Sequence, residues 1–331
     1  MVELWTAYRE YESLDLVKKL YQSKHGRDLS TTKALKITSS FMQGRNYMEA
    51  AENSDYSIRP LLLYYGIQSM SRGLILFLST EKADIRSSHG LALGNIQERA
   101  ANNSLTDLTF RISNGTFKEL VESTRNRTYF YENQSTINCH IDYDKLPDDY
   151  QFTLNEVLCG VPVLKPFVHA WLNSEPDCFQ VLRIDGPNPQ DEHKRISYSV
   201  KGNLNDATIE RLGFVEYERH FNDNPSGRQI TMITSPEVKR IVSHRPGNQF
   251  GFQLRFIASA RQNEATINDI SCAYALSHFL STLCRYHPTV WMGILMGREH
   301  NSLYPTAYRA IEFIESNYLR MLLEHLEPNN F

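Results

Sequence analysis

Two neighbouring stretches decide the fold: ALKITSSFMQGRNYMEAA at residues 34–51 and SIRPLLLYYGIQSMSRGLILFL at residues 57–78. In the first, apolar or small residues recur at steps of three and four, which is the period of one face of an α-helix. Ser30 or Thr31 is placed to cap this helix, which we expect to run to about Asn53. The residues on its stripe are Ala34, Ile37, Phe41, Gly44, Met48 and Ala51.

Gly44 stands in the centre of that stripe, although glycine costs a helix about 1 kcal/mol relative to alanine. Close approach of another backbone would explain glycine at this position. The second stretch is apolar nearly all round, with Ser57 as its expected cap and Pro60 in its first turn, so we expect a central helix. We predict an antiparallel pair in which Gly44 packs against the one stripe of small residues on the second helix. That stripe consists of Gly66, Ser69 and Gly73.

The window from Pro60 to Leu78 is the most apolar of the chain, but it carries Gln68 and Arg72 in its middle. A membrane-spanning helix needs about 20 mostly apolar residues and tolerates a central arginine poorly. The N-terminus lacks a basic segment followed by an apolar run, so we expect no signal peptide. We therefore predict a buried core helix and a cytoplasmic protein.

Outside the helix pair, the hydrophobic pattern of the sequence changes twice. An amphipathic run from Tyr8 to Tyr21 predicts one more helix, and short mixed elements fill the chain from the pair to residue 175. From residue 179 to 260 the hydrophobic period is two, with Gly- and Pro-rich breaks, which predicts an antiparallel unit of about five strands. The expected strands are residues 181–184, 195–200, 213–218, 229–234 and 250–257.

Helices return after residue 260. Asn268 or Asp269 is placed to cap one that stops near Tyr286, because Pro288 disfavours helix at the residue before it. Pro305 opens a last long helix.

The fold class that follows is α+β, with a mainly helical body and an inserted antiparallel β unit of about five strands. We expect three regions along the chain. A helical N-terminal region occupies 1–175, the β region 176–260, and C-terminal helices at 261–331 pack back on the N-terminal region.

Composition narrows the function classes. The 331 residues carry a formal net charge of −3, with 41% hydrophobic and 22% charged residues. The 16 Phe and 18 Tyr supply ample surface for a core, which excludes a mainly disordered chain. The near balance of charge excludes a global field that would attract nucleic acid or anionic lipid. Five scattered cysteines without a CxxC pair exclude a disulfide scaffold and a local zinc knuckle.

Sequence motifs of the common catalytic classes are absent. The sequence has no GxGxxG or GxxxxGK[ST] loop, so we expect no cradle for a dinucleotide or a nucleoside triphosphate. HExxH and GxSxG are absent too. None of the 11 histidines stands at i, i+4 from a second His, Cys or Asp in a convincing metal pattern. We therefore expect no cofactor and no metal, and we name no catalytic residue.

Several blocks of the sequence resemble the bacterial YaaC-like family. The match spans most of the chain, whereas the β region between about 179 and 260 matches poorly. The blocks are residues 39–47 with Ala50-Ala51-Glu52 and 57–66, then His89-Gly90-Leu91, then residues 154–158 with Val161-Pro162, and finally Leu276-Ser277 through Arg285-Tyr286-His287-Pro288 to Trp291.

This resemblance implies binding rather than catalysis, because the family is not a classical enzyme family. Its helical part looks similar to HEPN-type helix pairs, which include RNases and binding modules. Some YaaC-like proteins are implicated in bacterial anti-phage defence, including the killing of jumbo phages. There the YaaC-like protein is the sensor and works with a separately encoded partner.

The function implied is a non-catalytic infection sensor that recognises a phage-derived protein or membrane structure and recruits a partner effector. Nucleic acid is a less favoured partner, and assembly into a homo-oligomer stays open. A nucleotide-responsive regulatory module is one alternative. The other is a HEPN-like ribonuclease, which would carry Arg-x4–6-His.

Arg320-Met-Leu-Leu-Glu-His325 has the spacing of that ribonuclease motif. At about 100° per residue, five steps place the two side chains about 140° apart on a continuous helix. His325 lies on the apolar stripe of its helix and Arg320 does not. The pattern therefore favours a histidine at the end of a core stripe.

Candidate binding residues fall into two groups, of which the first lies on helices. Gln43, Arg45 and Tyr47 flank the central glycine, where they form either a polar network at the helix crossing or a pocket for a small anion. Arg285 and His287 stand at a helix C-terminus, which favours cations by about 0.3–1 kcal/mol each. The other reading of these two residues is a ligand or phosphate contact shared with Arg45.

The second group lies in the β region, where residues 237–261 hold five bases and one acid. Three aromatic residues alternate with these basic residues: Phe250, Phe252 and Phe256. A mixture of basic and aromatic side chains is suited to binding nucleic acid, anionic lipid or an acidic partner. Because the whole β region is nearly balanced in charge, a solvated sheet face is the other reading. The candidate binding residues here are Lys239, Arg240 and Arg245.

Overall fold

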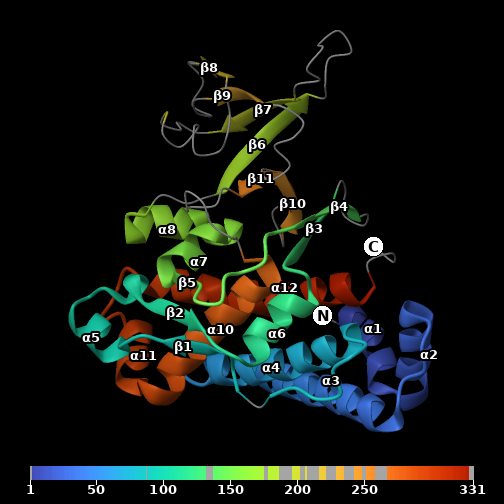
Figure 1. Ribbon diagram of the computed structural model, residues 1–331. Helices are drawn as coiled ribbons and strands as arrows, with labels where there is room; N and C mark the ends of the chain where they lie inside the picture. Colours follow the sequence, from blue (N-terminus) through green and yellow to red (C-terminus); the bar gives the residue numbers. More distant parts are fainter. Residues whose placement is uncertain are drawn as a thin grey trace.

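The computed structural model has a helical body below and an antiparallel β unit above it in the view of Figure 1. The expected class, mainly helical with an antiparallel sheet, is confirmed. The structure describes residues 2–86, 88–131, 137–174, 178–185, 196–201, 206, 216–220, 229–234, 242–247, 251–257 and 267–327.

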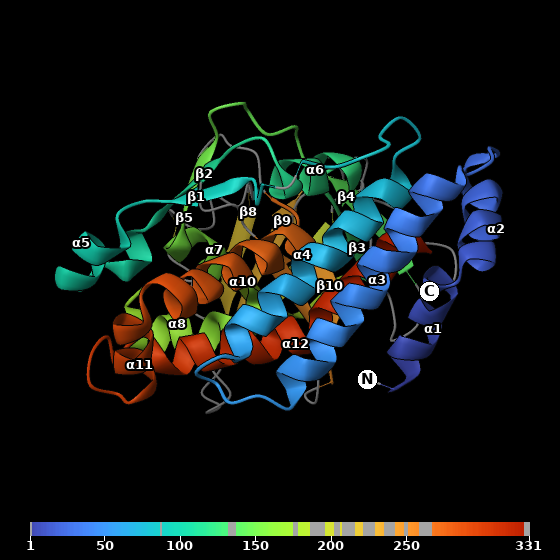
Figure 2. The ribbon, with the colours of Figure 1, turned by 90° about the horizontal axis from the view of Figure 1, so that it is seen from below.

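Two long helices, α3 (Thr31–Glu52) and α4 (Arg59–Leu78), form the predicted antiparallel pair (Figure 2). Ser30 caps α3, because its side chain accepts a hydrogen bond from the amide of Lys33. The predicted cap of α4 is wrong: the Ser57 amide donates to Asp55 Oδ1, and Ile58 precedes the helix. Pro60 lies in the first turn of α4, as expected.

The pair crosses at glycines, as the sequence predicts. A Cβ built on Gly44 would lie 3.1 Å from Gly66 O and 3.2 Å from the amide nitrogen of Met70, both tighter than ordinary van der Waals contact. A Cβ on Gly66 would lie 3.2 Å from Gly44 O in turn. The two missing side chains therefore let the two helix backbones touch.

The N-terminal residues form two helices instead of the single one expected. α1 (Val2–Glu12) and α2 (Leu14–His25) are separated at Ser13, whose backbone is extended. Both helices pack on α3. The apolar period of the run is helical throughout, so the break shows only in the backbone at Ser13.

The segment between the helix pair and the β unit consists of short elements. A three-stranded antiparallel sheet in the order β1-β2-β5 and a hairpin of β3 and β4 are not predicted from the sequence. The elements are β1 (Leu91–Leu93), α5 (Ile96–Ala101), the 3-10 turn η1 (Leu105–Asp107), β2 (Thr109–Ile112), α6 (Thr116–Ser123), β3 (Arg127–Tyr131), β4 (Ile137–Asp142), β5 (Gln151–Thr153), α7 (Leu154–Gly160), η2 (Pro162–Leu164) and α8 (Lys165–Leu172).

The β unit is one antiparallel sheet of six strands in the order β10-β11-β6-β7-β9-β8. The expected number of about five is wrong, because residues 242–247 add a strand that contains Pro246 and that we did not predict. This strand lies at the edge of the sheet, where a proline without an N–H group is tolerated. The strands are β6 (Cys178–Asp185), β7 (Ile196–Lys201), β8 (Glu216–His220), β9 (Gln229–Thr234), β10 (Val242–Gly247) and β11 (Gly251–Ile257).

Three helices return the chain to the helical body: α10 (Asp269–Tyr286), α11 (Pro288–Leu295) and α12 (Tyr304–Leu326). α10 and α12 pack on α4, on which α3 and α6 also pack. Among the described residues, α4 is the one helix long and apolar enough to cross a membrane. Most of its residues are buried inside the helical body, as expected for a core helix.

The first helices hold the last one. The hydroxyl of Tyr8 in α1 donates to the carbonyl of Leu319 in α12. Lys24 Nζ in α2 donates to the Leu326 carbonyl over 2.9 Å, and the last carbonyls of a helix have no partner within it. The two ends of the described chain are therefore joined by hydrogen bonds.

Candidate functional site

A cluster of polar side chains lies where α4, the loop before β1 and α10 meet. α4 contributes Tyr64 and Gln68, the loop contributes His89, and α10 contributes Tyr274 and His278. The ring centroid of His278 lies 5.2 Å from that of Tyr64 and 5.6 Å from that of His89. Three of the sequence blocks that carry the family resemblance, separated along the chain, thus meet in space.

His89 is the centre of the hydrogen bonding. Its Nδ1 lies 2.6 Å from Tyr64 Oη and 3.0 Å from Gln68 Nε2. Because an amide nitrogen only donates, Nδ1 accepts and the neutral ring carries its proton on Nε2. The Tyr274 hydroxyl donates to the carbonyl of His89 over 3.1 Å. Groups from α4 and α10 therefore fix both the ring and the backbone of this histidine.

Gly90 brings His89 to this position. Its φ of +79° is a left-handed conformation that glycine adopts without strain, and a Cβ would lie 2.8 Å from the amide nitrogen of Phe117. That amide donates to the His89 carbonyl over 3.0 Å, which ties the loop to the first turn of α6. The tight turn explains why glycine follows His89 in the sequence.

His278 is the more buried of the two histidines in the cluster. Its side chain is 6% exposed, and Nδ1 has no hydrogen-bond partner among the residues that the structure describes. Burial is the largest cause that lowers the pKa of His278 to about 3, and electrostatic interactions with His89 and Arg285 contribute to the same shift. Burial, followed by Arg285, also lowers the pKa of His89. Both rings are therefore neutral at pH 7.

Arg285 stands at the outer edge of the cluster, in the last turn of α10. Its Nη1 donates to Tyr65 Oη over 2.7 Å, and its Cζ lies 4.2 Å from the ring centroid of Tyr286. Its Nε is buried and has no hydrogen-bond partner. Within the part of the chain that the structure describes, no carboxylate forms an ion pair with this guanidinium.

The residues predicted around the central glycine point in different directions. Arg45 forms a two-pronged ion pair with Glu12 of α1, at 2.6 Å and 3.2 Å, and a second pair with Glu49 one turn along α3. Gln43 Oε1 accepts from Ser69 Oγ over 3.3 Å. These contacts form a polar network around the crossing, which is one of the two readings of the sequence.

Tyr47 lies on the opposite side of α3 from Arg45. Its ring centroid lies 5.5 Å from that of Tyr65, whose hydroxyl accepts from Arg285. The structure thus brings Tyr47 and Arg285 together through Tyr65. His287 is the residue after α10, and partial burial lowers its pKa.

The structure describes only part of the basic residues that are predicted to bind in the β region. Lys239 and Arg240 lie outside the described residues. The backbone of Arg245 lies on β10 opposite Gln253 of β11, and its side chain is outside the described part. Binding by these three residues stays a prediction.

The Arg320 and His325 pair is placed as the apolar stripe predicts. His325 is 4% exposed, and its ring meets that of Tyr129 edge-on with centroids 5.1 Å apart. Arg320 is half-buried. The histidine is part of the core of α12.

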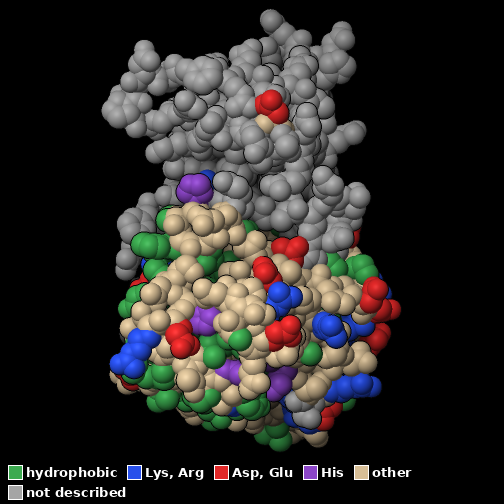
Figure 3. Space-filling model, turned by 90° about the vertical axis from the view of Figure 1, so that its left-hand side faces the viewer, with side chains coloured by type: hydrophobic (Ala, Val, Ile, Leu, Met, Phe, Trp, Pro, Cys, Tyr) green, Lys and Arg blue, Asp and Glu red, His purple; other side chains and the backbone are tan. Residues whose placement is uncertain are grey.

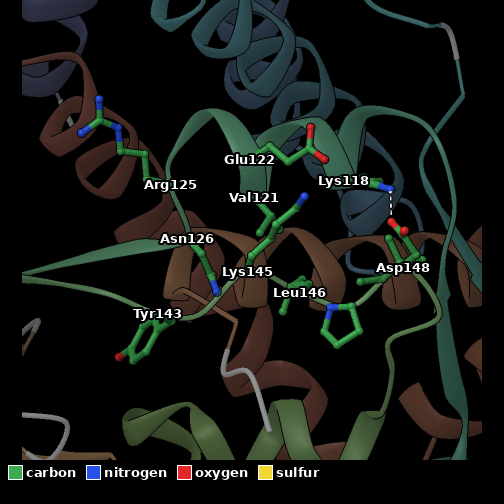
Figure 4. Close-up of a pocket in the computed structure, with 11 residues that line it drawn as sticks. Lys118, Val121, Glu122, Arg125, Asn126, Tyr143, Lys145, Leu146 and Asp148 are labelled. Carbon is green, nitrogen blue, oxygen red and sulfur yellow. Dashed lines mark hydrogen bonds and ion pairs between the residues drawn. The ribbon is translucent and has the colours of Figure 1, made fainter.

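A pocket of about 510 Å³ lies between α6 and residues 143–148 (Figure 4). Val121, Leu146 and Ile112 give it apolar walls, and Lys118 Nζ pairs with Asp148 Oδ1 over 3.0 Å at one end. In Figure 4 the ammonium of Lys145 reaches toward α6 from the opposite wall. Charges of both signs line this pocket, so its lining favours no single class of ligand.

The surface of the helical body is mixed in charge. On the face drawn in Figure 3, acidic and basic side chains are interspersed, with several histidines among them. Among the described residues, no group of three or more His, Cys, Asp and Glu side chains is placed to hold a metal ion.

The sequence pattern does not group Tyr64, His89, Tyr274 and His278. One signal is present: Tyr274 and His278 stand four residues apart, on one face of the same helix. Their partners come from segments about 190–210 residues away in the sequence, and helical period carries no information on such pairs.

Comparisons with known proteins place the whole chain in one family. Neither the curated proteins nor the solved structures contain a match. The family model described as YaaC-like protein matches residues 7–326. The chain belongs to the YaaC-like family.

Proposed function

We propose that this protein is a cytoplasmic, non-catalytic infection sensor of bacterial anti-phage defence. It recognises a phage-derived protein or membrane structure and recruits a separately encoded effector. Membership of the YaaC-like family supports this proposal, since some members are implicated in such defence. As part of the same proposal, we infer that the α3–α4 pair is similar to HEPN-type helix pairs.

The arrangement of the β unit is the observation that carries the recognition role. The unit is inserted between α8 and α10, and it projects from the helical body in Figure 1. An antiparallel sheet can bury one face and offer the other to a partner. The body below it is closed by its own helices, which leaves the inserted sheet as the element suited to variable recognition.

The position of His325 argues against ribonuclease activity at Arg320 and His325, and so favours a binding function. General acid–base catalysis needs a side chain within hydrogen-bond reach of the substrate. His325 packs on Tyr129 in the core and is 4% exposed. A substrate RNA would have to displace core packing to reach this imidazole.

The recognition role is tested by reversing charge in the β region. Lys239→Glu combined with Arg240→Glu should leave folding near wild type, because lysine and arginine are rarely buried in proteins and surface changes usually cost under about 0.5 kcal/mol. It should weaken capture of an acidic partner, since such association is steered by charge. The readouts are phage protection and effector pull-down at matched protein levels. The control is Lys19→Glu with Arg27→Glu, which makes the same charge change at exposed positions on the helical body.

Full protection by the β-region variant would place recognition elsewhere on the molecule.

The proposal that the protein is not a catalyst is tested by incubating the purified protein with total RNA. We expect intact RNA. Cleavage that His325→Ala abolishes would overturn the proposal in favour of a HEPN-like ribonuclease.

A further inference from the structure

Among the described residues, no carboxylate is paired with the guanidinium of Arg285. Its guanidinium is partly covered by Tyr65 and Tyr286, and only Nη1 has a hydrogen-bond partner given by the structure. Removing a charge from water destabilises the fold unless the charge is paired and hydrogen-bonded. Two other partly buried arginines of the body are paired: Arg45 binds Glu12, and Arg127 binds Asp142. The buried Nε of Arg285 has no partner among the described residues, and a group from outside the chain can supply one.

A second unpartnered group lies on the same helix. Nδ1 of His278 is buried without a partner, and His278 precedes Arg285 by two turns on α10. An arginine side chain on a helix leans toward the N-terminal turn, which directs Arg285 toward His278. Each group can donate to an oxyanion, Arg285 through Nε and His278 through a protonated Nδ1.

The groups that surround this place are neutral. α4 presents Tyr64, Tyr65 and Gln68, the loop presents His89, and none of them carries a negative charge at pH 7. Arg285 is the charge that acts on the pKa of both histidines and of Tyr64. Within the described residues the local field is therefore positive and uncompensated.

We propose that Arg285, His278 and His89 form a binding site for a small oxyanion, the phosphate or carboxylate group of a ligand. Gln68, Tyr65, His89 and Arg285 are each partly exposed, which gives the site an open rim. An anion there would pair with Arg285 and accept from the buried histidine, so that both unpartnered groups are satisfied by one ligand. This site does not depend on the proposed role in defence.

The experiment measures binding of inorganic phosphate, acetate and adenosine monophosphate to the full chain by calorimetry and thermal shift. Sodium chloride at equal ionic strength is the reference. We expect phosphate, acetate or the nucleotide to raise the melting temperature above the chloride reference, and the active compound shows which oxyanion the site takes. Arg285→Met should weaken that binding at least about tenfold, since a charge-assisted pair is lost.

The matched control is Arg309→Met, which removes an arginine of α12 whose partner is Glu312, and it should bind as wild type does. Tyr65→Phe keeps the aromatic ring but removes the hydroxyl that accepts from Arg285 Nη1. We expect this variant to lose less affinity for the anion than Arg285→Met does. Nitrogen chemical shifts of the His278 ring should change when the active anion is added. Equal binding by wild type and Arg285→Met, or no response to any of the three anions beyond chloride, would overturn the proposal.

Discussion

Gly44 shows how one missing side chain sets the distance between two helices. The atoms nearest to a Cβ on this residue include Gly66 O and the amide nitrogen of Met70, which belong to the backbone of α4. Backbone atoms in a helix cannot turn away as a flexible side chain can. Any larger residue must therefore push α3 and α4 apart.

Gly44→Leu should destabilise the protein by about 1–3 kcal/mol or more, because it overpacks this crossing. Urea unfolding followed by circular dichroism measures the change. Gly160→Leu is the matched control, since a Cβ at Gly160 would meet no atom within 4 Å. A melting temperature equal to that of wild type in Gly44→Leu would remove the argument for a close crossing.

His278 gives the stability of the protein a dependence on pH. Its pKa is about 3 in the folded protein, below the ordinary value of 6.5. Between these two values the unfolded chain binds a proton that the folded chain does not, so stability falls as pH falls. The slope from this one group is at most about 1.4 kcal/mol per pH unit.

The variant His278→Phe should therefore lose less stability than wild type between about pH 6.5 and pH 4. Denaturant unfolding at several pH values measures both curves. His140→Phe, at an exposed position on β4, is the control and should follow wild type. Parallel curves for wild type and His278→Phe would show that this histidine does not titrate as its burial implies.

At the scale of the element, the start of α10 depends on Asn268. Its Oδ1 accepts from the Ser271 amide over 3.2 Å, which caps the helix. Its Nδ2 donates to Thr124 Oγ1 over 2.9 Å and to Arg127 O over 3.1 Å, which fixes the helix start to the end of α6 and the start of β3. One side chain thus both begins α10 and sets its direction.

Asn268→Ala should cost about 1–3 kcal/mol, because a cap is lost and buried groups are left without partners. Asn95→Ala is the matched control, since Asn95 caps the exposed start of α5 by the same kind of bond. That variant should cost at most about 1 kcal/mol. Equal effects of the two substitutions would show that Asn268 acts as a cap alone.

At the scale of the whole molecule, α4 is the centre of the core. α3 covers it from the N-terminal region, and α10 and α12 cover it from the C-terminal region. Hydrophobic stabilisation follows the apolar area that is removed from water. The N-terminal helices therefore lack much of their core without the last 60 residues or so.

A fragment of residues 1–175 should fail to unfold cooperatively, because it exposes the face of α4 that α10 and α12 cover in the full chain. Thermal unfolding and near-ultraviolet circular dichroism measure this. Adding residues 261–331 as a second fragment should restore a cooperative transition at least in part. A sharp transition of the 1–175 fragment alone would show that the N-terminal region is an independent domain.

Local signals predicted the ends of several helices. Ser30 and Asn268 cap the helices as expected, and Pro288 ends α10 as expected. The glycine stripe predicted the crossing because a glycine inside a long helix lowers its stability unless another backbone packs against it. Helix caps and small-residue stripes are decided within one or two turns, so the sequence alone contains them.

The remaining features depend on distant partners. Pro246 hid the edge strand β10, since a proline argues against a strand unless its place in the sheet is known. The break at Ser13 interrupts a run whose helical period is continuous. The cluster around His89 joins residues 64, 89 and 278, and pairings of that separation follow from tertiary packing.

The position of α4 at the centre of the body has a consequence for synthesis on the ribosome. Its covering helix α10 begins about 190 residues after α4 ends, and at about 5–20 residues per second the helix waits roughly 10–40 s for it. During this interval the long apolar helix α4 lacks α10 and α12, which cover it in the complete fold. The nascent chain is therefore a natural client for a chaperone that holds apolar segments until translation is complete.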